Sequence, residues 1–172
     1  MVGVLMLTAC SDIGPKTLPT TTSPTVVPSV TTIGAEPALC QSPLKLQEVS
    51  TEFAKVIGTS PVFATGMDAA GVVAGSVNSG RLEGKILWIV ETSMAAPVTV
   101  TVANLDATMA VRDQPAVQTA TLEPADAVPS SSDVNFKEYP STIAASGPGC
   151  VTVTARWPPD GSWTARLLLT DA

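Results

Sequence analysis

The sequence predicts an all-β fold, an antiparallel β-sandwich of Ig-like or related type, over residues 40–172. Three observations lead to this prediction. Val, Thr and Ala are abundant while aromatic residues make up only 4% of the chain, a balance that suits strands better than long helices. Several segments alternate apolar and polar residues with the period of a strand. Pro and Gly turns separate these short segments, as they do in sandwiches and barrels.

The first two segments of this domain have the weakest patterns. Residues 46–57 fit either a strand or a short helix, which Ser50 or Thr51 would cap. Residues 66–84 contain five Gly and little periodicity. Because Gly is a strong turn signal, we expect a long loop here with at most one short strand, at residues 71–74.

The strands expected next are better defined. Residues 85–90 form a continuous apolar run, typical of a strand that is buried on both faces. Pro97 introduces residues 98–102, in which Val and Thr alternate and therefore occupy opposite faces. Residues 107–112 and 117–122 are expected to form two further, weaker strands.

The chain ends in a predicted hairpin. Residues 151–157 and 163–169 alternate on either side of a Pro-Asp-Gly turn, in which Pro fixes φ and Gly accepts a positive φ. The odd-numbered residues of both arms are apolar, so Trp157 and Trp163 should share the inner face. We therefore expect both rings to pack in the core rather than to stack on a sugar. The third Trp, within residues 85–90, is expected in the core as well.

The start of the chain has a different character. Residues 2–9 are apolar but shorter than the roughly 20 residues that span a membrane, and an apolar run ending in small residues is typical of a secretory signal. The four residues Leu7-Thr8-Ala9-Cys10 resemble the lipobox of bacterial lipoproteins. The resemblance implies that Cys10 carries a diacylglyceryl group and becomes the first residue after cleavage. No Lys or Arg precedes Cys10, so we expect residues 1–9 to be a truncated signal peptide with its start upstream.

Residues 10–39 are expected to hold the lipidated Cys and a disordered tether. This stretch contains five Pro and seven Thr, has no amphipathic period and cannot bury a core. The order of lipobox, tether and globular domain predicts a protein anchored to the cell membrane by lipid and facing outside the cytoplasm. Two acyl chains on Cys10 would hold it stably.

Two further cysteines, Cys40 and Cys150, flank the predicted domain. In an exported protein we expect them to form a disulfide, with two buried free thiols as the alternative. Cys150 has the parity of Thr152 and Thr154 rather than of the core-facing Val residues. A bridge at this position should therefore need a bulge or a place at the edge of the sheet.

Composition excludes several chemistries. The chain has no His, which removes Ser-His-Asp and Cys-His catalysis and every imidazole metal site. Its net charge of −6 argues against nucleic-acid binding. We expect no catalytic residues, no metal site and no cofactor. A glycan hydrolase would need two carboxylates close together, and the candidates are Glu83, Glu91 and Asp106. We expect these side chains to serve surface solubility instead.

A second resemblance covers the chain from about residue 61 to its end. Several segments resemble a family of uncharacterised bacterial extracytoplasmic β-sandwich domains, and the most specific are the K-x-L-W strand at Lys85–Trp88 and Pro148-Gly149-Cys150. The others are Thr59–Phe63, Ala96–Val100, Leu105-Asp106 and Tyr139–Ser141. The resemblance implies a sandwich fold and brings no activity with it.

These features predict a non-catalytic binding or interaction module at the cell envelope, with an envelope protein or a glycan as its partner. Two alternatives stay open at this point. One is a carboxylate-based hydrolase of envelope polymers, and the other is a structural spacer of the envelope.

Overall fold

The computed structural model describes Cys40 and residues 44–104, 106–130 and 133–172. Eleven strands and one short 3-10 turn make up its regular structure, and these residues contain no α-helix. The elements in chain order are β1 (Ile57–Thr59), β2 (Val62–Thr65), β3 (Val72–Asn78), β4 (Arg81–Glu91), β5 (Val98–Ala103), β6 (Thr108–Val111), β7 (Thr119–Leu122), η2 (Pro124–Asp126), β8 (Val128–Pro129), β9 (Phe136–Ala145), β10 (Gly149–Trp157) and β11 (Gly161–Asp171).

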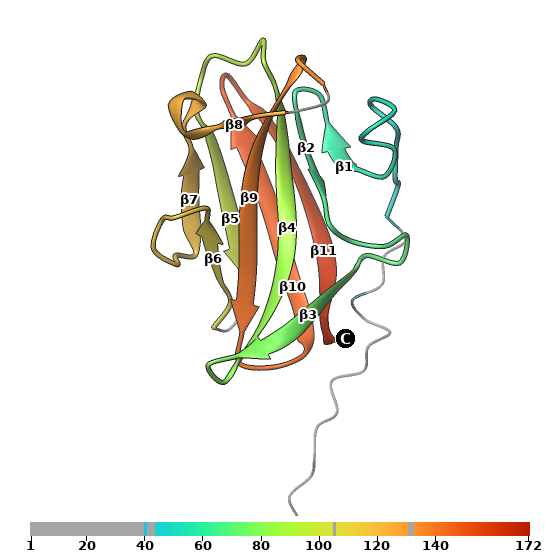
Figure 1. Cartoon of the computed structure of the whole chain (residues 1–172), viewed down its shortest axis with the longest axis vertical. Helices are drawn as coiled ribbons and strands as arrows, with labels where there is room; N and C mark the ends of the chain where they lie inside the picture. Colours follow the sequence, from blue (N-terminus) through green and yellow to red (C-terminus); the bar gives the residue numbers. More distant parts are fainter. Residues whose placement is uncertain (1–39, 41–43, 105, 131–132) are drawn as a thin grey trace, which may run out of the picture. The chain divides into compact units, whose positions relative to one another are not determined.

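The strands form a sandwich, which confirms the predicted fold class (Figure 1). One layer contains β1, β2, β4 and β9, with β6 and β8 paired to the far side of β9. The other layer contains β11, β10, β5 and β7; in Figure 1, β10 and β11 pass behind β4 and β9, while β5 and β7 lie to the left of β9. The strand β3 joins the layers, because its second half pairs with β4 and its first half pairs with β11. The β3–β11 pair is parallel and the other paired strands are antiparallel.

The main core lies between the two layers. Val98, Val100 and Val102 of β5 are at most 1% exposed, whereas the Thr residues between them point outward, so the predicted alternation is confirmed. The same parity holds on β10 and β11, where Val153 and Leu167 are fully buried. Burial of these apolar side chains is the main favourable contribution to folding.

A smaller cluster covers the outer face of β2, β4 and β9. Its buried members are Phe53, Val56, Phe63, Ile89 and Phe136. Because Ile89 is buried in this cluster while its neighbours on β4 face the main core, the prediction of a strand buried on both faces is confirmed for this part of β4.

Residues 46–57 supply Phe53 and Val56 to this cluster. The segment forms neither the strand nor the short helix that we considered for it. It is a loop closed by one isolated bridge between Gln47 and Val56, and only its last residue, Ile57, enters a strand. Within it the Phe53 amide donates a hydrogen bond to Ser50 Oγ at 3.3 Å.

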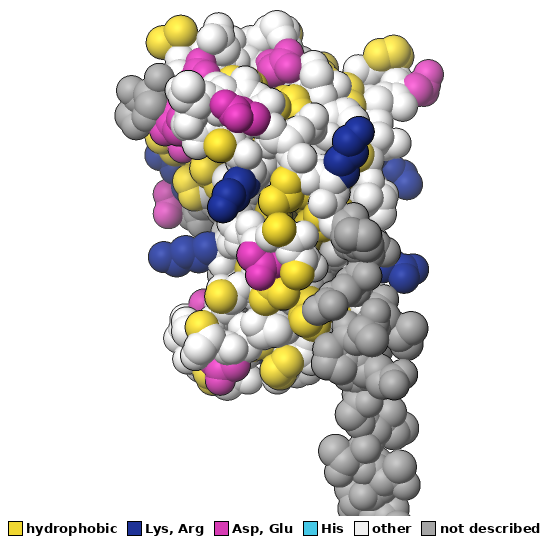
Figure 2. Space-filling model, turned by 90° about the vertical axis from the view of Figure 1, so that its right-hand side faces the viewer, with side chains coloured by type: hydrophobic (Ala, Val, Ile, Leu, Met, Phe, Trp, Pro, Cys, Tyr) yellow, Lys and Arg dark blue, Asp and Glu magenta, His cyan; other side chains and the backbone are white. Residues whose placement is uncertain are grey.

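Figure 2 views the sandwich from the side of β1, and the described Lys and Arg side chains stand singly on this surface.

The expected long loop at residues 66–84 is wrong in its second half, which forms the hairpin of β3 and β4. The hairpin turns at Ser79 and Gly80, whose φ values of 50° and 78° are those of a tight two-residue hairpin. Other glycines here serve close packing rather than turning. A Cβ atom at Gly84 would lie 2.5 Å from the Leu169 side chain and 2.6 Å from that of Val73.

The C-terminal hairpin forms as predicted, but its expected turn is wrong in one respect: Gly161 does not adopt a positive φ and instead begins β11 opposite Trp157. β10 and β11 pair in continuous register from Gly149 opposite Leu169 to Trp157 opposite Gly161. Trp157 and Trp163 share the inner parity and both pack against the main core, although both are only half-buried. The missing side chain of Gly161 leaves the space that the indole of Trp157 fills.

Candidate functional site

The structure joins Cys40 to Cys150, with their Cα atoms 5.4 Å apart and a sequence separation of 110. This separation lies in the normal range for a disulfide and supports the predicted pairing. No bulge is needed. Cys150 pairs only with Leu168 of β11, because the pairing of β10 with β5 begins at Thr152. The bridge therefore sits at the end of the sheet. Cys10, the predicted lipidation site, lies outside the described residues.

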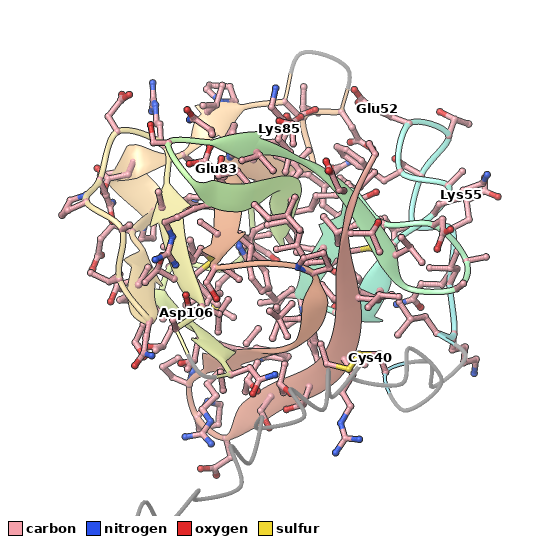
Figure 3. All side chains as sticks on the ribbon, turned by 90° about the horizontal axis from the view of Figure 1, so that it is seen from below. Cys40, Glu52, Lys55, Glu83, Lys85 and Asp106 are labelled. Atoms are coloured by element: carbon pink, nitrogen blue, oxygen red, sulfur yellow. A yellow bond between two sulfur atoms is a disulfide. The ribbon has the colours of Figure 1, made fainter. Side chains whose placement is uncertain are left out.

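The three candidate carboxylates do not behave as one site. Glu83 and Glu91 lie on the same strand, β4, and the eight residues from 83 to 91 span roughly 26 Å. Glu83 accepts a hydrogen bond from Asn78 Nδ2 at 3.0 Å, and Asp106 forms an ion pair with Arg81 at 3.8 Å. Figure 3 shows Glu83 and Asp106 at separate places on the domain. Within the described residues, no group of three or more acidic or sulfur side chains is placed to hold a metal ion.

A different set of polar side chains is brought together on the outer surface of β5, β7, β10 and β11. We call this surface the hydroxyl–arginine face. Its members are Thr99, Thr101, Thr119, Thr121, Thr152, Thr154, Arg156, Ser162, Thr164 and Arg166.

Strand register places these side chains in rows across the sheet. Thr119, Thr101, Thr154 and Thr164 are successive partners on four adjacent strands. Neighbouring strands lie about 4.8 Å apart, so the hydroxyls of this row stand close together. Two hydrogen bonds connect them, Thr101 Oγ1 with Thr119 Oγ1 at 3.3 Å and Thr154 Oγ1 with Thr164 Oγ1 at 2.9 Å.

The next row contains Thr121, Thr99, Arg156 and Ser162, again as successive partners. A hydroxyl both donates and accepts hydrogen bonds, and its hydrogen rotates to suit its partner. These rows therefore present donors and acceptors to solvent over four strands.

The face differs in charge from the rest of the domain. Arg156 and Arg166 are exposed, and neither takes part in either of the ion pairs found among the described residues. The four strands carry no Asp or Glu before Asp171, at the very end of β11. An acidic protein of net charge −6 thus keeps one sheet face free of carboxylates and gives it two arginines.

A hollow of about 630 Å³ opens at one end of the face. Thr99, Thr121 and Arg156 line it, together with the half-buried indole of Trp157 and the turn at residues 158–162, which includes Asp160. Its volume is in the range of small-molecule sites. The hollow combines hydroxyls, a guanidinium and an aromatic ring in one place.

The other layer has a smaller hollow of about 450 Å³, lined in part by Lys85, Arg112 and Asp113. The Arg112 guanidinium is already engaged, since its Nε lies 3.8 Å from Asp113 and its Nη1 donates to the Asp126 carbonyl at 3.1 Å. A third, of about 240 Å³, is lined in part by Tyr139. Burial raises the pKa of the Tyr139 phenol, as do the nearby carboxylates of Asp126 and Glu123.

The sequence did not single out the hydroxyl–arginine face. The outward parity of Thr on residues 98–102 is visible in the sequence, but the neighbouring strands are not. Trp157 was expected only in the core, whereas it also lines the hollow.

Neither a family model nor a curated protein sequence matches this chain. Among solved structures, the chain is similar to the ASH/PapD-like domain of human CEP192 (PapD-like domain 7), with 11% sequence identity and a TM-score of 0.31. The match covers 73% of this chain and 96% of that domain. No helix of the described part is both long and apolar enough to cross a membrane.

Proposed function

We propose that this protein is a lipid-anchored extracytoplasmic lipoprotein whose β-sandwich is a non-catalytic binding module. The observation that carries the binding role is the hydroxyl–arginine face. It is an exposed polar surface with an adjoining hollow and two arginines outside the ion pairs of the described residues, on a regular sheet that holds its side chains in place. The candidate carboxylates, by contrast, each have a structural partner or stand apart, which gives a hydrolase no support.

The anchoring role rests on the sequence around Cys10. Leu7-Thr8-Ala9-Cys10 fits the lipobox, and the Pro- and Thr-rich residues 11–39 suit a tether between a lipidated Cys and a domain. The Cys40–Cys150 bridge is consistent with export, because disulfides persist in oxidising compartments. The face would then be displayed outside the cytoplasm.

The intact mass of the protein extracted from cell membranes tests this proposal. We expect a chain that begins at Cys10 and carries acyl groups, and whose mass rises by two hydrogens on reduction. A Cys10→Ser variant should leave the membrane fraction, whereas a Cys150→Ser variant should stay in it. An unmodified wild-type chain that retains Met1 would overturn the anchor.

A further inference from the structure

We propose that the hydroxyl–arginine face binds an anionic polysaccharide, a glycan whose sugars carry carboxylate or phosphate groups. This inference rests on the proposed binding function and names the chemistry of the ligand. Three features of the face support it: its charge, its hydroxyl rows and the aromatic ring beside them.

Charge favours an anionic ligand. The whole chain is acidic and repels polyanions, yet the four strands of the face hold Arg156 and Arg166 and no carboxylate before Asp171. Both guanidiniums are exposed and outside the ion pairs of the described residues. The planar guanidinium matches carboxylate and phosphate groups in a bidentate geometry. Two arginines are too few for a nucleic acid, whose affinity depends on many phosphate contacts.

The spacing of the arginines favours a polymer over a single small anion. Arg156 is opposite Ser162 on β11, and Arg166 lies four residues further along that strand. The two Cα atoms are therefore roughly 14 Å apart. Successive charged sugars of a chain can contact both arginines with their side chains upright on the sheet, whereas one small anion would need both side chains to fold toward it.

Hydroxyls occupy the space between the arginines. Thr154 lies two residues before Arg156 on β10, and Thr164 lies two residues before Arg166 on β11. The Oγ1 atoms of the two threonines are 2.9 Å apart. Neutral hydroxyls of this kind can donate hydrogen bonds to the hydroxyls of a sugar and accept hydrogen bonds from them. An acidic peptide would be better served by an apolar groove, whereas the side chains of this part of the face are hydroxyls.

The Trp157 ring supplies an apolar surface. It lines the hollow next to Arg156 and Thr99, and the apolar face of a sugar ring can pack on a half-exposed indole. Asp160 is the acidic residue of this hollow. The geometry points to one sugar seated in the hollow and its chain running along β10 and β11, across the rows, toward Arg166.

Binding of defined polymers to the detergent-solubilised full chain tests the inference. The probes are polygalacturonate, which carries carboxylates, and phosphomannan, which carries phosphates, with neutral dextran and polyglutamate as comparisons. We expect one or both anionic glycans to bind with an affinity that falls as salt rises, because exposed charges are screened. Dextran and polyglutamate should bind at least tenfold more weakly.

Matched variants locate the site. The Arg156→Gln/Arg166→Gln pair should weaken anionic glycan binding at least tenfold, and Thr154→Val, which keeps the shape but removes a hydroxyl, about threefold. Lys55→Gln removes one exposed positive charge away from the face and should leave binding unchanged. All four positions are solvent-accessible, so the melting temperature should stay within a few degrees of the wild-type value.

Several outcomes would overturn the inference. One is that the Arg156→Gln/Arg166→Gln variant binds the anionic glycans as tightly as the wild type does. Another is that dextran binds as tightly as the anionic glycans, and a third is that neither anionic glycan binds. If polyglutamate binds best and depends on the same arginines, the face recognises an acidic peptide. The glycan assignment then fails while the proposed binding function stands. The mass of the membrane-extracted chain reports on the anchor independently of all these results.

Discussion

Trp163 Nε1 donates a hydrogen bond to the main-chain carbonyl oxygen of Val62 at 2.8 Å, across 101 residues of sequence. The bond connects β11 in one layer to β2 in the other. The Trp163 ring also lies 5.6 Å from the ring of Trp88, which is fully buried in the core. Gly58 makes this arrangement possible, because a Cβ atom there would lie 2.7 Å from Trp163 Nε1. Its φ of 116° also suits Gly alone.

The first prediction concerns this link. Trp163→Phe keeps an aromatic ring but removes the donor, and should lower the free energy of unfolding by about 1–3 kcal/mol, measured by urea denaturation. Trp157→Phe is the matched control, since the Trp157 indole donates no hydrogen bond to another described residue, and it should cost less. Equal losses in the two variants would show that the hydrogen bond contributes nothing.

The disulfide gives a second prediction. Its closed loop is long, so on the chain-entropy model its removal in a Cys40→Ala/Cys150→Ala variant should lower the free energy of unfolding by about 4–5 kcal/mol. Guanidinium denaturation with and without reductant measures this loss. Reductant should destabilise the wild type and leave the variant unchanged. Wild-type stability in the variant would mean that the bridge does not form in the native protein.

A pair of substitutions on β5 tests whether its Val side chains face the core and its Thr side chains face solvent. Val100→Thr places a hydroxyl at a position with 0% exposure and should lower the free energy of unfolding by about 1–3 kcal/mol. Thr101→Val makes the reverse change on the outer face and should stay within about 0.5 kcal/mol of the wild type. Thermal denaturation of the wild type and both variants measures the two losses of stability. A larger loss for Thr101→Val would place the core on the wrong side of β5.

Tyr139 makes the stability depend on pH in the alkaline range. Its pKa is raised above the ordinary value of 10.0 in the folded protein, by burial first and then by Asp126 and Glu123. Above pH 10 the unfolded chain therefore loses the phenol proton before the folded chain does, and stability falls as the pH rises. Below that pH both states keep the proton, and this contribution is constant.

Tyr139→Phe removes this pH dependence together with the hydrogen bond from the Tyr139 hydroxyl to the Glu123 carbonyl. The variant should be about 1 kcal/mol less stable than the wild type at neutral pH, and the difference should shrink above pH 10. Because the chain has one Tyr, the absorbance of the phenolate follows its titration directly. A midpoint at or below pH 10 in the folded protein would contradict the expected shift.

Local patterns predicted most of the fold. Strict alternation predicted which side of β5 faces the core, and alternation on both sides of the turn predicted the hairpin of β10 and β11. The hairpin of β3 and β4 was missed because its glycines resemble turn signals. Gly84 instead lets Leu169 and Val73 pack closely, which depends on a strand far along the chain.

The candidate site could be predicted only in part. The sequence shows which residues of each strand point outward, but not that β10 lies between β11 and β5. Without that order, Thr101, Thr154 and Thr164 are separate surface residues rather than one row. The hollow beside Trp157 likewise depends on β5, β7 and the last hairpin meeting at one end of the sheet.

The position of the disulfide also determines how the domain would bear mechanical load. A pull along the chain that precedes Cys40 enters the fold through the sulfur bridge at Cys150, so the long stretch between the two cysteines is bypassed. The tension passes directly into β10, which is flanked by β11 and β5. These strands carry the hydroxyl–arginine face. In a protein tethered through Cys10, a polymer held on that face would be connected to the membrane through β10 and the bridge rather than through the long stretch between the two cysteines.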